Sequence, residues 1–519
     1  MICYNTAMEK KRLYLSIENI FVYGYFLLSA VLFLLLASRS SLLYVCNNWD
    51  DANSYFSMGK ALFNGKVLYR DVFDQKGMYL YFLYGLAYLV SHTTFKGVFL
   101  LEIILGTLDI IGFNKILSLY TKKRIAALLA PLPFMTIVSS RSFWWGGAAE
   151  EICLPIYIWG LYILLDYFKN KYPDSTMSFK RIFIGGLLAG LIANIKFTGL
   201  GFFFAWMALV WLAFLTHKEF VSSIKACVIF LLGMFVPFVP WIIYFALNHA
   251  LYDWYWGYVY INVFLYPNEA MGGIFGRIYT MAKILYWLIW DNFMYFAFVI
   301  LGLFYSLLKR NQKILTRFAA PILFAFMFMG IFIGGRELPY YSLPLSVFSV
   351  LGVALCGEVI DFFLAKRKEN SMSGFGVKDI LISVLLCAFS TIIIYFTSMN
   401  IPFLAETKEN MFLYRFRDEV LTEDDPTLLN IGCLDAGLYT LTGIVPSCRW
   451  FQTQTLDVPE PENNPYKEQD RYIKEAMTDF VIARDTYPEF IFEKYDLIDQ
   501  APYSYSGYDF IFYLFKKKQ

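Results

Sequence analysis

Apolar runs of about twenty residues, separated by short charged clusters, dominate the chain, and this is the length that a helix needs to cross the hydrocarbon core of a bilayer. Hydrophobic residues make up 58% of the 519 residues, above the share typical of soluble domains. The sequence therefore predicts a polytopic α-helical membrane protein with about eleven transmembrane helices. The candidate spans lie near residues 18–38, 97–119, 125–139, 152–167, 182–195, 200–216, 226–247, 285–307, 314–333, 341–364 and 379–398.

Charge and composition exclude other classes. The net charge of +2 gives no basic face for nucleic acid, so we expect no nucleic-acid partner. Three histidines and eight scattered cysteines show no metal-ligand spacing. The first apolar run is too long for a cleavable signal sequence and indicates a signal anchor among membrane lipids.

The short apolar stretch 78–91 decides the predicted topology. It has about 14 residues, fewer than a span needs. If it does not cross the membrane, nearly every basic cluster falls on the side of the amino terminus, as the positive-inside bias requires. We therefore expect an interfacial or re-entrant helix on the outer face, with the amino terminus cytoplasmic and the carboxy terminus outside the cytoplasmic membrane. The inner clusters are Lys10, Lys11 and Arg12; Lys122, Lys123 and Arg124; Lys169, Lys171, Lys180 and Arg181; Lys218 and Lys225; Lys309, Arg310, Lys313 and Arg317; and Lys366, Arg367, Lys368 and Lys378.

The composition changes near residue 400. Charges return, and acidic or proline-rich stretches at 423–425 and 459–465 indicate loops. Short apolar runs between these loops are typical of strands. We expect residues 1–399 to form the membrane domain, with a catalytic outer loop at 39–96, and residues 400–519 to form a small extracytoplasmic α/β domain.

The first outer loop carries the most informative residues. Asp50 and Asp51 stand where the first span ends and residues 52–63 begin a predicted helix on the membrane surface. Either aspartate could simply cap that helix. A cap does not explain the second pair, Asp71 and Asp74, or Lys76, which precedes the short apolar stretch.

This loop resembles the GT-C superfamily, whose membrane glycosyltransferases take sugars from polyprenyl-phosphate carriers. The likeness is to the branch of protein mannosyltransferases and aminoarabinose transferases, extends loosely over the spans and is weakest in the carboxy-terminal domain. Met78 stands where that branch often has proline. The matching residues are Asp51, Tyr55, Gly59, Gly65, Tyr69, Asp71, Asp74, Lys76 and Gly77.

The resemblance implies roles for individual residues. Asp51 matches the catalytic aspartate and is our candidate general base, with Asp50 as the alternative or a helper, since adjacent carboxylates raise one another's pKa. Lys76 matches the lysine beside the carrier phosphate, where a point charge is suited to the anion. Asp71 and Asp74 are candidates for contacts with the acceptor or a metal.

The second outer loop, 139–151, ends in Glu150 and Glu151. GT-C enzymes place an acidic residue on this loop, so either glutamate could bind acceptor or metal. Alternatively, both begin the next span, where negative charge suits a helix amino terminus. Carboxylates from two loops could hold a divalent cation, Mg²⁺ or Mn²⁺, and this cofactor stays open.

Two cationic residues near the outer face are further candidates for binding the donor phosphate. Lys196 lies between two spans, where snorkelling to the interface is the alternative to a phosphate contact. Arg336 lies in the turn 334–341, where an ion pair with Glu337 competes.

These features favour an inverting glycosyltransferase with a polyprenyl-phosphate-linked sugar as donor. Its acceptor, outside the cytoplasmic membrane, would be a cell-wall polymer, a surface polysaccharide, a lipid-linked glycan or a protein. The alternatives are a lipid or glycan transporter or flippase, and a noncatalytic relative that binds the carrier lipid. A transporter would place ionisable residues deep within spans and show related halves, but most acids here sit at one interface and no internal repeat is visible.

Overall fold

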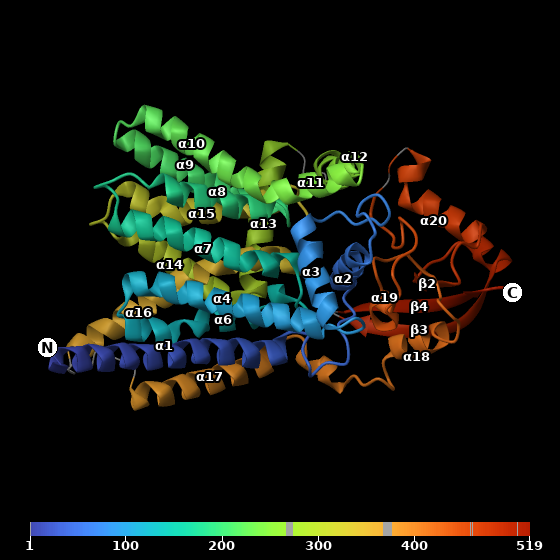
Figure 1. The fold of residues 1–519 in the computed structure, drawn as a ribbon, viewed down its shortest axis with the longest axis horizontal. Helices are drawn as coiled ribbons and strands as arrows, with labels where there is room; N and C mark the ends of the chain where they lie inside the picture. Colours follow the sequence, from blue (N-terminus) through green and yellow to red (C-terminus); the bar gives the residue numbers. More distant parts are fainter. Residues whose placement is uncertain (1, 266–272, 367–375, 457, 459, 506) are drawn as a thin grey trace.

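Long helices lie side by side along the longest axis of the molecule, and a smaller domain containing a sheet sits at the end of the chain (Figure 1). The computed structural model describes residues 2–265, 273–366, 376–456, 458, 460–505 and 507–519. The predicted inner residues Arg367 and Lys368 lie outside this part. The amino terminus and the sheet domain lie at opposite ends of the long axis (Figure 1).

Eight helices in the described residues are long and apolar enough to cross a membrane, and a bent pair makes up to nine. This confirms a multi-pass helical membrane protein, while its orientation in the cell stays a prediction. Predicted spans near 125–139 and 182–195 correspond to shorter helices. The helices of the bundle are α1 (Ile2–Ala37), α4 (Lys96–Tyr120), α5 (Lys123–Leu129), α6 (Pro131–Val138), α7 (Ala149–Asn170), α8 (Phe179–Ala193), α9 (Leu200–Thr216), α10 (Phe220–Phe235), α11 (Val239–Leu247), α12 (Leu251–Trp254), α13 (Ile274–Asp291), α14 (Phe293–Leu308), α15 (Ile314–Phe332), α16 (Ser349–Lys366) and α17 (Val377–Thr397).

The span predicted near 285–307 is broken at Asn292. The helices on either side of this residue, α13 and α14, meet at an angle of 115°. The Asn292 side chain donates to the Leu288 carbonyl at 3.2 Å and accepts from the Ser142 amide at 2.8 Å. Asparagine side chains compete with the helix for backbone groups, which explains a break within an apolar run.

Two short helices, α2 (Asp50–Phe63) and α3 (Met78–Val90), lie between the bundle and the sheet domain (Figure 1). With 13 residues, α3 is the short apolar helix that the sequence predicts. The two pack closely, since a Cβ at Gly59 would lie 2.5 Å from the Gly85 nitrogen. Gly77 is equally constrained, because a Cβ there would lie 2.1 Å from the Asn194 carbonyl oxygen.

The carboxy-terminal domain is built on a four-stranded mixed sheet in the order β1-β2-β4-β3. β1 and β2 are parallel, and the other pairs are antiparallel. The last membrane-length helix ends at Thr397 and β1 begins at Leu428, on either side of the predicted boundary. The elements are α18 (Phe412–Val420), β1 (Leu428–Ile431), α19 (Leu438–Thr442), α20 (Pro465–Lys474), β2 (Phe480–Arg484), β3 (Tyr495–Tyr505) and β4 (Tyr508–Lys517).

Candidate active site

Helix α2 carries the paired aspartates and is enclosed on both sides. Every residue from Asp51 to Ala61 is buried, so the carboxy-terminal domain covers the helix that the sequence predicts at the membrane surface. Its polar residues form hydrogen bonds with the carboxy-terminal domain. This contact explains why polar and apolar residues alternate in the sequence of the helix. The bonds run from Ser57 to Asp435 at 2.6 Å, from Lys60 to the Tyr439 carbonyl at 2.6 Å, from Thr440 to Asn53 at 2.6 Å and from Gln452 to Ser54 at 2.7 Å.

Asp51 lies in the first turn of α2 and is 8% exposed. The Tyr340 hydroxyl donates to its Oδ2 at 2.5 Å. Tyr340 comes from the 3₁₀ segment Pro339–Phe348, and its ring meets Trp49 edge-on at a centroid distance of 4.9 Å. The carboxylate is thereby held in one orientation at the end of the bundle next to the carboxy-terminal domain.

Asp50, the neighbouring aspartate, points to a different partner. Its carboxylate forms an ion pair with Arg484 at 3.1 Å, at the end of strand β2. Burial raises the pKa of Asp50, the Arg484 charge opposes that rise and Asp51 adds to it. The two adjacent aspartates therefore have different surroundings: Asp50 joins the two domains, whereas Asp51 faces Tyr340.

Glu150 and Lys196 form a buried ion pair close to Tyr340. Glu150 begins α7 and Lys196 follows α8, and their side chains are 4% and 15% exposed. The Lys196 ammonium lies 3.8 Å from the centre of the Tyr341 ring and 5.6 Å from that of Tyr340. The adjacent tyrosines thus connect Asp51 to the Glu150–Lys196 pair.

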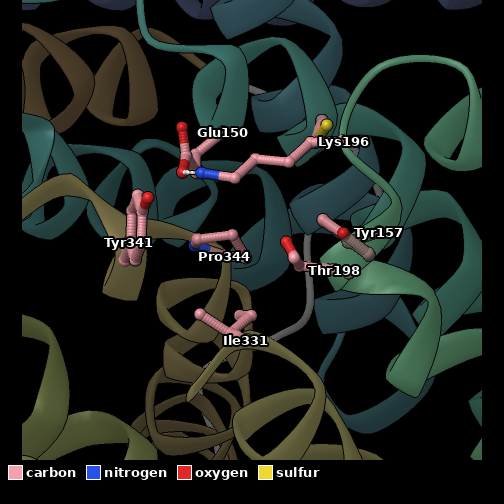
Figure 2. Close-up of a pocket in the computed structure, with 9 residues that line it drawn as sticks. Glu150, Tyr157, Lys196, Thr198, Ile331, Tyr341 and Pro344 are labelled. Carbon is pink, nitrogen blue, oxygen red and sulfur yellow. Dashed lines mark hydrogen bonds and ion pairs between the residues drawn. The ribbon is translucent and has the colours of Figure 1, made fainter. Parts of the chain in front are cut away.

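A cavity opens beside this ion pair. Figure 2 shows the Lys196 side chain extended toward Glu150, with Thr198, Pro344 and Ile331 below it in the view. The remaining lining residues are Cys153, Tyr157, Gly199 and Tyr341. Among the described atoms, Glu150 Oε2 is buried without a hydrogen-bond partner, so this carboxylate keeps one acceptor unused.

The loop that carries Lys76 packs against the loop that carries Lys196. The Gly77 amide donates to the Ile195 carbonyl at 3.1 Å, and the Tyr79 amide donates to the Asn194 carbonyl at 3.2 Å. These bonds bring the backbones of the two candidate phosphate-binding lysines together. Lys76 itself is half-buried.

The other candidate residues lie at this end but have different contacts. Asp71 accepts from its neighbour Arg70 and from the Val67 amide, both at 2.8 Å, within a turn. Asp74 is buried and accepts from Tyr81 at 2.8 Å and from Gln454 at 3.2 Å. Glu151 accepts from the Gly147 amide at 2.8 Å, as expected at a helix amino terminus, and half-buried Arg336 precedes the 3₁₀ segment.

The sequence analysis missed two residues of this region. Arg484 is 434 residues from Asp50, and Tyr340 is 289 residues from Asp51. Tyr340 carried a weak signal, because two tyrosines follow Arg336 in a short outer turn. Arg484 carried none.

The residues present do not fit a metal centre. In the part of the chain that the structure describes, no three His, Cys, Asp or Glu side chains are grouped to hold an ion. A cation on Glu150 would lie beside the Lys196 ammonium, whose positive charge opposes its binding.

No protein-family model matches the chain, and no curated protein matches its sequence. Among solved structures, it is similar to ArnT from Cupriavidus metallidurans bound to undecaprenyl phosphate, with a TM-score of 0.59 and 13% identity over 94% of this chain and 98% of that one. The apo state of the same ArnT gives a TM-score of 0.57 and 12% identity, covering 98% of each chain. The chain therefore shares the fold of ArnT.

Proposed function

We propose that this chain is an inverting glycosyltransferase that moves a sugar from a polyprenyl-phosphate carrier to an acceptor outside the cytoplasmic membrane. The observation that carries the proposal is the cluster of Asp51, Tyr340, Glu150 and Lys196 at one end of a GT-C fold. It places a carboxylate that can take a proton near a lysine that can bind a phosphate.

Lys196 is the proposed partner of the donor phosphate. ArnT, which shares the fold, was solved with undecaprenyl phosphate, so a carrier of that chemistry suits this chain. The anion would compete with Glu150 for the ammonium group, and Tyr341 would keep that group in place. Lys76 would approach from the adjoining loop and add a second positive charge.

In the proposed reaction, Asp51 removes the proton from an acceptor hydroxyl. The acceptor oxygen then attacks the anomeric carbon and forms the new glycosidic bond, while the bond to the carrier phosphate breaks. The phosphate leaves with the bonding electron pair, and Lys196 and Lys76 stabilise its charge. Displacement from the opposite face inverts the anomeric centre.

Asp50 has a supporting role in this proposal. Its ion pair with Arg484 connects the start of α2 to the carboxy-terminal domain, so that domain helps to fix the position of Asp51. The acceptor would approach at this end, as a cell-wall polymer, a surface polysaccharide, a lipid-linked glycan or a protein. No step of this reaction is assigned to a metal ion.

The test is sugar transfer in vesicles that contain the full-length protein and a panel of polyprenyl-phosphate sugars. We expect transfer from one donor by the wild type and a rate lower by about 10²-fold or more in Asp51→Asn, with unchanged thermal stability. Equal transfer by the variant would overturn the mechanism. Binding of carrier lipid without transfer to any acceptor would favour a noncatalytic relative, and movement of intact donor lipid across the bilayer would favour a flippase.

A further inference from the structure

A second cavity lies at the end of the bundle opposite the candidate active site. It is formed where α4, α7 and α14 end and α15 begins, together with one side of α16 (Figure 1). Its polar lining consists of Tyr120, Lys169, Tyr305, Ser306, Lys309, Gln312 and Thr316. Its apolar lining consists of Leu165, Phe168, Gly302, Ala320, Leu351 and Ala354.

Two lysines line this cavity, and within the described residues only Lys309 is paired with a carboxylate. Lys309 forms an ion pair with Glu358 at 2.9 Å, and the Tyr305 hydroxyl donates to the same carboxylate. Lys169 donates to the Leu119 carbonyl and has no ion pair within the described residues. Positive charge therefore exceeds negative charge in this cavity.

Both ammonium groups lie close to one aromatic ring. Lys169 Nζ lies 4.1 Å and Lys309 Nζ lies 5.1 Å from the centre of the Tyr120 ring. Tyr305 gives Lys309 a second ring at 4.3 Å. These contacts restrict both lysines, so an anion that binds between them does not have to order two flexible side chains.

The apolar surroundings indicate what would be attached to that anion. Leu301, Phe304 and Leu308 on α14 are 51%, 63% and 69% exposed. Their spacing places them on one face of the helix, next to the cavity-lining residues Gly302 and Tyr305. An apolar chain could lie along this face while its head group enters the cavity.

We propose that this cavity binds the phosphate head group of an anionic membrane lipid, in the leaflet opposite the candidate active site. Basic pockets between transmembrane helices commonly take such head groups. The lipid phosphate would lie between Lys169 and Lys309, and Glu358 would limit its affinity by competing for Lys309. Free phosphate has the same charge but lacks the chain, so the two ligands can be told apart.

The experiment titrates purified full-length protein in detergent with phosphatidylglycerol, phosphatidylcholine or inorganic phosphate and follows the thermal unfolding midpoint. We expect phosphatidylglycerol to raise the midpoint more than either of the others. The variant Lys169→Gln/Lys309→Gln should weaken the apparent affinity for phosphatidylglycerol by about tenfold or more, the ratio for the loss of one charged contact. The matched control Lys171→Gln/Lys180→Gln removes two exposed charges at the same end and should behave as wild type.

A second variant is expected to raise the affinity for phosphatidylglycerol, and misfolding could not explain such a rise. Glu358→Gln keeps a side chain that can bond Tyr305 but removes the competing charge, so the affinity for phosphatidylglycerol should rise by about threefold or more. Unchanged affinity in both Lys169→Gln/Lys309→Gln and Glu358→Gln would overturn the proposal. Stabilisation by inorganic phosphate equal to that by phosphatidylglycerol would also overturn it, because the lipid chain would then contribute nothing to binding.

Discussion

The two ends of the helix bundle each hold a lysine–glutamate pair beside tyrosine rings, but the pairs differ in burial and in charge balance. At the candidate active site, the Lys196 and Glu150 side chains are 15% and 4% exposed, and the charges match one to one. At the opposite end, Lys309 and Glu358 are 19% and 26% exposed, and Lys169 adds a second positive charge.

This difference separates two ways of binding an anion. A phosphate that reaches Lys196 has to replace Glu150, so binding is an exchange that leaves a buried carboxylate in need of another partner. A phosphate at the opposite end adds to a site with excess positive charge. The paired charges at Lys196 favour selectivity over affinity. The excess positive charge at the opposite end favours binding of any phosphate that is attached to an apolar chain.

A third buried lysine shows what burial does without an ion pair. Lys60 on α2 is fully buried and donates to the Tyr439 carbonyl at 2.6 Å, and no ion pair to it occurs in the described part of the chain. Burial lowers its pKa to about 7, although Asp435 opposes the change. Burial without an ion pair therefore disfavours the charged form of Lys60.

The largest expected effect comes from the proposed base. Asp51→Asn removes the proton acceptor and should lower kcat by a factor of about 10² to 10⁴ or more, the usual contribution of a general base. Initial rates of sugar transfer in vesicles provide the measurement. Asp50→Asn is the matched control and should reduce the rate less, because Asp50 contacts Arg484. A larger loss in Asp50→Asn would reverse the two assignments.

Substitution of the active-site lysine should have the next largest effect. Lys196→Gln should lower kcat/KM for the donor by about 10- to 100-fold, since it removes a charged contact worth about 1.5–3 kcal/mol. The same substitution leaves Glu150 buried and unpaired, so the thermal midpoint should also fall. Adding Glu150→Gln should recover the stability but not the activity. Recovery of both would show that the pair is only structural.

The tyrosine that orients Asp51 should matter less. Tyr340→Phe removes one hydrogen bond to the carboxylate and should lower kcat by about tenfold, with little change in KM. Tyr341→Phe keeps the ring beneath Lys196 and serves as the control. Steady-state kinetics with the natural donor would separate the two, and a change in KM alone for Tyr340→Phe would contradict its positioning role.

The smallest expected effect is a change in the pH dependence of thermal stability, and it concerns Lys60. The unfolded chain binds the Lys60 proton near pH 10.5, but the folded chain binds it only near pH 7, so folding loses stability as the pH falls across this window. Wild type should therefore melt higher at pH 9 than at pH 7. Lys60→Met should reduce that difference by about 2–4 °C or more, given the usual relation between free energy and midpoint.

Thermal unfolding of both proteins at the two pH values tests this prediction. Lys467→Met, an exposed change in the carboxy-terminal domain, should keep the wild-type difference. An equal difference in wild type and Lys60→Met would show that Lys60 titrates as an ordinary lysine.

The sequence by itself determined the membrane-helical class, the short helix before residue 91 and the resemblance to GT-C enzymes. These features depend on local length, apolar content and a motif within one loop, so no distant contact is needed to find them. The structure and the likeness to ArnT confirm them. The roles of Asp51, Lys76, Lys196 and the other candidates stay predictions.

Only the tertiary structure decided the setting of these residues. The sequence predicts α2 at the membrane surface but does not show what covers its polar side, because the partners Asp435, Tyr439 and Gln452 lie nearly 400 positions later. The motif already separated Asp51 from Asp50, but only the fold shows that Arg484 and Tyr340 give the two carboxylates different neighbours. Local pattern fixes which segments enter the membrane, whereas charge pairing across the fold fixes which of two adjacent carboxylates faces the candidate site.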